Sequence, residues 1–72
     1  MVSEDAVIDA WNKCDSSRFL GLFFQTPMLM RLRLLVKFKD ELRDMDKRDP
    51  SYGLKSEMYF EANATSTMAP RM

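Results

Sequence analysis

The residues best equipped for chemistry in this chain are a group of carboxylates and one thiol. Four acids lie close together in the sequence and suggest a metal ligand set or an acid–base pair: Asp40, Glu41, Asp44 and Asp46. They alternate with Arg43, Lys47 and Arg48 on what reads as an exposed helix. A solvated face with surface ion pairs explains that alternation better than a binding site does, so we predict no metal site there.

Cys14 is the single cysteine of the chain, and there is no histidine. A reactive thiol needs a neighbouring group that lowers its pKa, so Cys14 is interpreted as a small buried hydrophobic residue. The same counts exclude an internal disulfide and argue against structural zinc. Two glycines, Gly21 and Gly53, make no phosphate-binding loop. The glycosylation sequon at residues 63–65 is interpreted as chance. We therefore expect no enzyme activity, cofactor or small-molecule substrate.

The chain is organised around one long helix, expected over about residues 27–48. Thr26 is expected to cap its N-terminus, with Pro27 in the first helical position. Asp49-Pro50 ends the helical run. One apolar stripe follows it at three- and four-residue spacing, which is typical of a helix packed along a seam. The stripe consists of Leu35, Phe38, Leu42 and Met45.

The first half of this helix carries apolar residues on its other sides as well. They are Leu29, Met30, Leu32, Leu34 and Val36. A helix that is apolar nearly all round is normally buried on several sides. Beyond Lys39, only two positions of the helix are apolar. We therefore expect the helix to begin inside an apolar environment and to end in water.

Shorter elements are expected on both sides of the central helix. Ser3 can cap a first helix that runs to about Asp15, with Trp11 as its main anchor. Residues 18–25 are interpreted as a short second helix, with a short buried strand as the alternative, because a short apolar run has no diagnostic period. We predict an all-α fold with a helical unit over 1–50. Residues 51–72 are expected to form an extended tail pinned on a partner.

Length limits what this chain can bury by itself. For 72 residues, apolar burial and conformational entropy nearly cancel, so chains of this size commonly depend on disulfides, metals or partners. We expect partners here, because the sequence supports neither of the other two. The acidic N-terminus does not resemble a secretory signal, and charged residues interrupt the apolar run 19–36, so no transmembrane span is predicted. We therefore expect the protein to lie in the cytoplasm or in an organelle, without a choice between them.

Basic side chains interrupt the apolar half of the central helix. Arg31, Arg33 and Lys37 are interpreted as contacts for acidic groups of a protein partner, with anionic lipid headgroups as the alternative. Nucleic acid is disfavoured, because the net charge of the chain is zero and the basic residues do not gather on one face.

These patterns favour a small, non-catalytic accessory subunit that fills a groove between larger subunits of a multiprotein assembly and stabilises them. An organellar membrane complex, such as a mitochondrial respiratory-chain complex, would suit an apolar and basic half-helix. One alternative is a regulator that homodimerises through the Leu35–Met45 seam and binds one target. Another is a peripheral membrane-surface binder. The residues predicted to anchor the partner are Trp11, Phe19, Phe23, Phe24, Leu32, Leu35 and Phe38.

Overall fold

The computed structural model describes the backbone of residues 2–68 and the side chains of residues 2–64. That part of the chain forms four helices and no strand: α1 (Glu4–Asn12), α2 (Ser16–Phe23), α3 (Met28–Asp44) and α4 (Tyr52–Met68). The predicted all-α fold is therefore confirmed. Most of residues 18–25, for which a strand was the alternative, are helical because they belong to α2.

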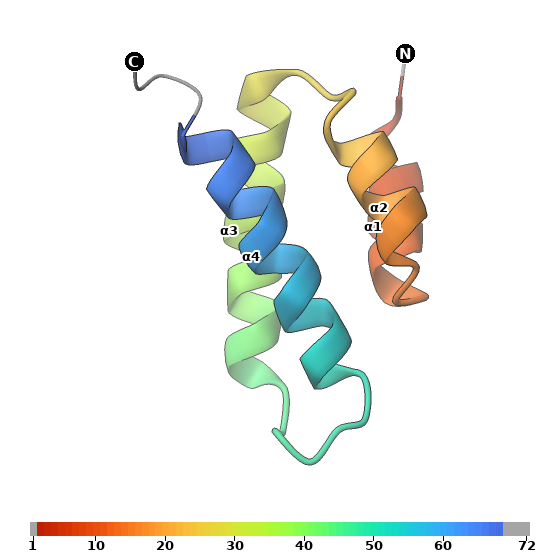
Figure 1. Cartoon of the computed structure of the whole chain (residues 1–72), viewed down its shortest axis with the longest axis vertical. Helices are drawn as coiled ribbons and strands as arrows, with labels where there is room; N and C mark the ends of the chain where they lie inside the picture. The colour runs from red at the N-terminus through yellow and green to blue at the C-terminus, as the bar shows by residue number, and fades with distance from the viewer. Residues whose placement is uncertain (1, 69–72) are drawn as a thin grey trace.

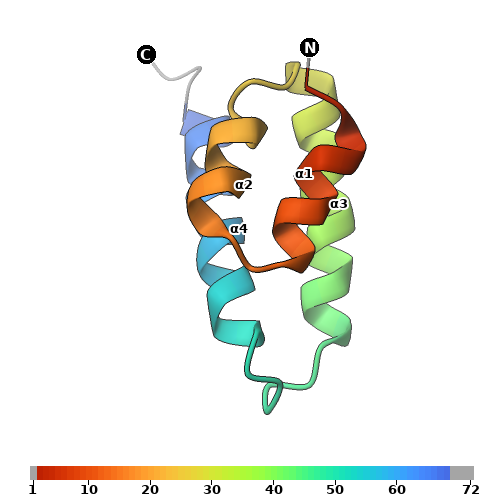
Figure 2. The same cartoon turned by 90° about the vertical axis from the view of Figure 1, so that its right-hand side faces the viewer.

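The helices form two antiparallel pairs that pack as two layers. Figure 1 shows α3 and α4 side by side, with α1 and α2 on one side of them. In the view turned by 90°, α1 lies over α3 and α2 over α4 (Figure 2). Helices α1 and α2 have 9 and 8 residues, whereas α3 and α4 have 17 each. The short pair therefore covers only one side of the long pair.

The core lies between these layers and is built around aromatic rings. Trp11 of α1 stacks on Phe38 of α3, with ring centroids 4.0 Å apart and planes 11° apart. Phe19 of α2 meets both rings at 5.5 Å. Such ring pairs contribute beyond the area they bury. The complete set of buried hydrophobic residues among those described is Val7, Ala10, Trp11, Phe19, Phe23, Leu34, Leu35, Phe38, Met58 and Ala62.

The two short helices begin and end as their local sequence favours. The Ser3 hydroxyl accepts a hydrogen bond from the Ala6 amide, and Asp15 caps α2 in the same way. Helix α1 ends at Asn12, earlier than expected, and Cys14 takes a left-handed conformation with φ 56°. The amide of Cys14 donates to the Trp11 carbonyl and that of Asp15 to the Ala10 carbonyl, a Schellman closure. Cys14 is therefore a half-buried turn residue rather than part of a helix face.

Both ends of α3 differ from the expectation of a helix over about 27–48. Pro27 is the N-cap residue, and Thr26 turns back so that its hydroxyl donates to the Phe23 carbonyl at 2.6 Å. At the other end α3 stops at Asp44. The reason is local competition in the loop that follows, where Asp46 and Asp49 accept hydrogen bonds from backbone amides two residues ahead. Aspartate side chains that bond in this way favour turns over helix.

The prediction of an extended tail over residues 51–72 is wrong for residues 52–68, which form α4. Its inward face consists of Met58, Ala62 and the stem of Lys55, all buried at helical spacing. One small residue and one lysine give too weak an apolar stripe to be recognised in the sequence. A helix of this kind is held by tertiary packing more than by its own pattern. Residues 69–72 of the predicted tail lie outside the described residues.

Candidate functional site

The main candidate for a functional surface is an exposed group of large hydrophobic residues. Among the described residues, seven large hydrophobic side chains are exposed, and five of them fall between residues 24 and 36. We call these five the apolar patch: Phe24, Met28, Leu29, Leu32 and Val36. Scattered exposed hydrophobic residues are ordinary, but several in one short segment mark a binding surface. Leu54 and Phe60 on α4 complete the seven.

The patch lies along one face of α3. Leu29, Leu32 and Val36 follow one another at spacings of three and four, so they project from the same side of the helix. That side points away from the core, since Leu29 is 80% exposed and Val36 62%. On the core-facing side of the same helix, Leu34 and Phe38 are fully buried. Helix α3 therefore has two apolar faces, and the chain itself covers one of them.

Arg31 fixes the corner at which the patch begins. Its guanidinium donates hydrogen bonds to the carbonyls of Phe24 and Thr26, the latter at 3.1 Å. It also lies 6.0 Å from the ring centroids of Phe23 and Phe24. The Phe24 carbonyl belongs to the C-cap of α2, and Thr26 lies in the link between α2 and α3. The guanidinium of Arg31, predicted to bind an acidic partner or lipid, is thus already engaged in joining α2 to α3.

The other two predicted basic contacts remain accessible. Arg33 pairs with Glu4 of α1 at 3.3 Å, but its side chain is still 67% exposed. Lys37 is exposed one turn further along α3. Exposed ion pairs contribute little to stability and exchange easily with other partners. Arg33 and Lys37 can therefore meet an approaching acidic group, unlike Arg31.

Most of the predicted partner anchors lie within the chain's own core. Trp11, Phe19, Phe23, Leu35 and Phe38 are all buried. They offer no surface in this fold, so any direct partner contact by the predicted set falls to Phe24, 36% exposed, and Leu32, 46% exposed. These anchors were selected mainly because their side chains are large and apolar. A large apolar side chain is normally buried, but its size does not show whether its own chain or a partner buries it.

Three members of the patch, Met28, Leu29 and Val36, were not among the predicted anchors. For Leu29 and Val36, the signal that could have found them is their position on the helix. They lie opposite the Leu35–Met45 seam, so a helix that uses the seam for its own core must leave them outside. Met28 lies one heptad before Leu35, in line with the seam, yet it is 45% exposed, so its position gave no such signal. The seam is indeed turned inward at Leu35 and Phe38, whereas Leu42 and Met45 are half-buried.

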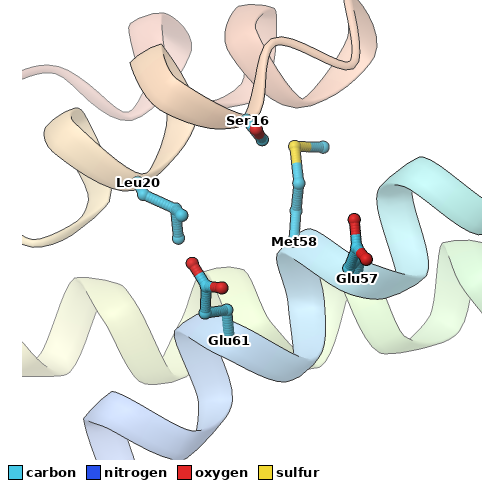
Figure 3. A pocket seen from close by; sticks show the side chains of 5 residues that line it. All are labelled: Ser16, Leu20, Glu57, Met58 and Glu61. Carbon is cyan, nitrogen blue, oxygen red and sulfur yellow. The ribbon is translucent and has the colours of Figure 1, made fainter.

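A small cavity between α2 and α4 is the other candidate. It holds about 50 Å³ and is lined by Ser16, Leu20, Glu57, Met58 and Glu61. The sticks in Figure 3 come from both helices and face a common space. This volume suits a few water molecules rather than a substrate. No group of three potential metal ligands occurs among the described residues.

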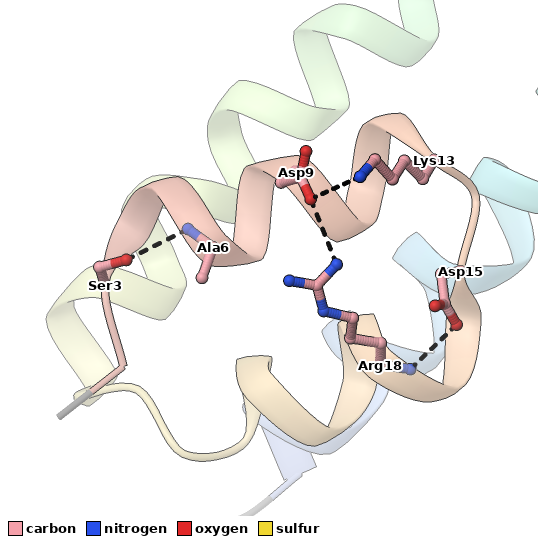
Figure 4. A network of polar contacts seen from close by, with 6 residues as sticks. All are labelled: Ser3, Ala6, Asp9, Lys13, Asp15 and Arg18. Atoms are coloured by element: carbon pink, nitrogen blue, oxygen red, sulfur yellow. Dashed lines mark hydrogen bonds and ion pairs between the residues drawn. The ribbon is translucent and has the colours of Figure 1, made fainter.

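A polar network ties the N-terminal helices together. Asp9 accepts from Lys13 at 3.3 Å and from Arg18 of α2 at 3.2 Å, as drawn in Figure 4. Hydrogen bonding and charge from Lys13, together with the bond from Arg18, lower the pKa of Asp9 below its ordinary value. In the loop after α3, amide and side-chain bonds lower the pKa of Asp46 and Asp49 in the same direction.

These lowered pKa values predict the acid response of the fold. A carboxylate with a depressed folded pKa stabilises the protein above its unfolded pKa, and that contribution is lost as the pH falls through the folded value. We expect the melting temperature to decline below about pH 4. Asp9→Asn should make this decline shallower. Melting followed by circular dichroism from pH 7 to pH 2 tests it, with Asp5→Asn on the same helix as the control. Parallel curves for the wild type and Asp9→Asn would contradict the assignment.

No helix within the described part of the chain is long and apolar enough to cross a membrane. Comparisons with models of protein families, with curated proteins and with solved structures gave no match for this chain.

Proposed function

We propose that this chain is a small, non-catalytic subunit that docks by its apolar patch onto a larger protein of a multiprotein assembly and stabilises it there. The observation that supports the proposal is the second apolar face of α3. Leu29, Leu32 and Val36 stay exposed although the same helix supplies Leu34, Leu35 and Phe38 to a closed core. Apolar surface beside a packed core is costly in water, and a docking site is its common use in proteins.

The shape of the patch supports binding to a protein groove. Its corner is held by Arg31, and the opposite face of α3 is fixed by the aromatic core, so the exposed side chains project from a rigid helix. A binding surface that needs no ordering loses less entropy when it docks. A helix face carrying anchors at i, i+3 and i+7 is also the usual form of helix-in-groove recognition.

The homodimeric alternative would need a different surface. Its proposed seam runs from Leu35 to Met45, and Leu35 and Phe38 are buried against the chain's other helices. Dimerisation through that seam would require opening the core that Trp11 and Phe38 form.

The test separates docking from folding by changing two exposed residues. We expect Leu32→Asp with Val36→Asp to leave the melting temperature nearly unchanged, because surface substitutions usually alter stability by less than about 0.5 kcal/mol. In cells of the source organism, the tagged wild-type chain should migrate in a high-mass fraction, and the double variant should migrate at the mass of the free chain. The matched control is Leu54→Asp with Phe60→Asp, which places the same two charges at the exposed hydrophobic residues of α4. Co-migration of the double variant with the assembly would refute the proposal.

A further inference from the structure

The charges beside the apolar patch form an ordered stripe along α3. Arg33, Lys37, Asp40 and Asp44 follow one another at spacings of four, three and four, and all four are exposed. They therefore share one side of the helix, next to the side that carries Leu29, Leu32 and Val36. The stripe is basic where it borders the patch and acidic in the last turns of the helix, where Asp40 also forms an exposed ion pair with Arg43 at 2.9 Å. A partner lying on the patch meets these charges in a fixed order.

A second copy of the chain does not match this pattern. If two α3 helices pack antiparallel so that Leu29 faces Val36, the two Arg33 side chains meet near the twofold axis. If they shift so that Arg33 faces Asp44 and Lys37 faces Asp40, the apolar residues no longer overlap. In a parallel pair in register, the stripes of the two helices lie on opposite sides of the contact, so neither stripe meets complementary charges of the other. Charge and apolar contact thus favour different self-pairings, and like charges in contact oppose association.

A flat anionic membrane fits less well than a helix does. Arg33 and Lys37 would attract phosphate groups, but Asp40 and Asp44 lie further along the same side and would be repelled. The charge on a helix can change sign along its length, whereas the surface of an anionic bilayer is negative throughout.

We propose that the patch binds an amphipathic helix of another protein whose flanking charges mirror the stripe. Such a helix has an apolar stripe that packs on Leu29, Leu32 and Val36. Beside that stripe it carries acidic residues level with Arg33 and Lys37, and basic residues level with Asp40 and Asp44. The inference rests on the proposed function and names the chemistry of its partner. The contact from Leu29 to Asp44 spans roughly 23 Å at about 1.5 Å per residue.

Two synthetic peptides serve as probes. Each is a helix of about 18 residues with leucines at i, i+3 and i+7. The first peptide carries glutamates at the end that meets Arg33 and lysines at the end that meets Asp44. The second keeps the leucines in place and has the glutamates and lysines exchanged. We expect the wild-type chain to bind the first about tenfold more tightly, since each exposed pair contributes little but the exchange reverses all of them. Calorimetry gives the affinities, and NMR shifts of Leu32 and Val36 locate the contact.

Exchanging the charges on the chain is the decisive arm. Arg33→Glu with Lys37→Glu should abolish the preference, and adding Asp40→Lys with Asp44→Lys should reverse it. The control pair Lys13→Glu with Lys47→Glu changes net charge equally on other surfaces and should keep the wild-type preference. The melting temperature of each variant shows whether it is folded. Asp40→Lys with Asp44→Lys alone should also abolish the preference, which gives a second route if the first variant does not fold.

Several outcomes would overturn this inference. They are equal affinity for both peptides, no shift at Leu32 or Val36 at millimolar peptide, and loss of the preference in the control pair. Sedimentation with phosphatidylglycerol vesicles but not with phosphatidylcholine vesicles, together with equal peptide affinities, would assign the patch to a membrane. A four-charge variant that still enters the cellular assembly would refute the charge order while leaving the proposed function standing. If the wild-type chain shows the expected peptide preference but the Leu32→Asp, Val36→Asp variant still enters the assembly, the proposed function is refuted and the charge order is not.

Discussion

Trp11→Ala is expected to unfold this chain. Trp11 is fully buried, stacks on Phe38 with ring centroids 4.0 Å apart, and packs against Phe19 at 5.5 Å. Removing a buried ring costs about 3–5 kcal/mol, because the contacts are lost and a cavity remains. At roughly 0.05–0.15 kcal/mol per residue, that cost is comparable with the whole stability of a protein this small. Helix content and thermal melting by circular dichroism measure the effect.

Two controls identify the cause. Phe60→Ala removes an aromatic ring that is 64% exposed, so it should change stability little. Trp11→Phe keeps a ring in the stack and removes the indole Nε1, which is buried and has no hydrogen-bond partner among the described residues. Loss of that unpaired donor offsets part of the lost packing, so this variant should remain folded. Equal stability of Trp11→Ala and Phe60→Ala would contradict the proposed core.

Glu41→Ala is expected to have the second largest effect. Lys55 of α4 is almost fully buried, and its Nζ donates to Glu41 Oε2 at 2.9 Å and lies 5.7 Å from the Trp11 ring centroid. Without Glu41, the ammonium group loses its hydrogen-bonded carboxylate and keeps the Trp11 ring and the more distant charge of Asp49. Breaking a buried ion pair costs about 3–5 kcal/mol. Because the Glu41 side chain is 35% exposed, water can reach the site, and we expect about 1–3 kcal/mol.

A double-mutant cycle tests this explanation. Adding Lys55→Met to Glu41→Ala should recover part of the loss, because the apolar stem remains and no unpaired charge stays buried. Asp40→Ala breaks a pair with Arg43 of nearly the same length, 2.9 Å, whose side chains are 56% and 69% exposed. Chemical denaturation should show a much smaller loss for that variant. If Asp40→Ala and Glu41→Ala cost the same, burial of Lys55 does not control the effect.

The two effects come from one place in the fold. Trp11 touches a ring of α2, a ring of α3 and the ammonium group of α4. Its side chain therefore joins all four helices, and the Lys55–Glu41 pair closes one side of it. The stability of the apolar patch depends on the same cluster, because Phe38 fixes the inward side of the helix whose outward side carries Leu32 and Val36.

Local sequence alone determined the helical class and the start of the first helix. Ser3 was recognisable as a cap because a capping side chain bonds to an amide only three residues away. The inward position of Leu35 and Phe38 relative to the rest of α3 also followed from spacing, since helical periodicity fixes which residues share a face.

Tertiary structure decided which molecule covers each face. The sequence gives the same apolar character to Leu34 and Val36, yet one is fully buried and the other 62% exposed. The difference arises because α1, α2 and α4 pack on only one side of α3. Helix α4 itself became visible only in the fold, since Lys55 and Ala62 acquire an apolar role through contact with α1, α2 and α3 rather than through their own pattern. Spacing is a local property of a helix, whereas burial depends on neighbours that are distant in sequence.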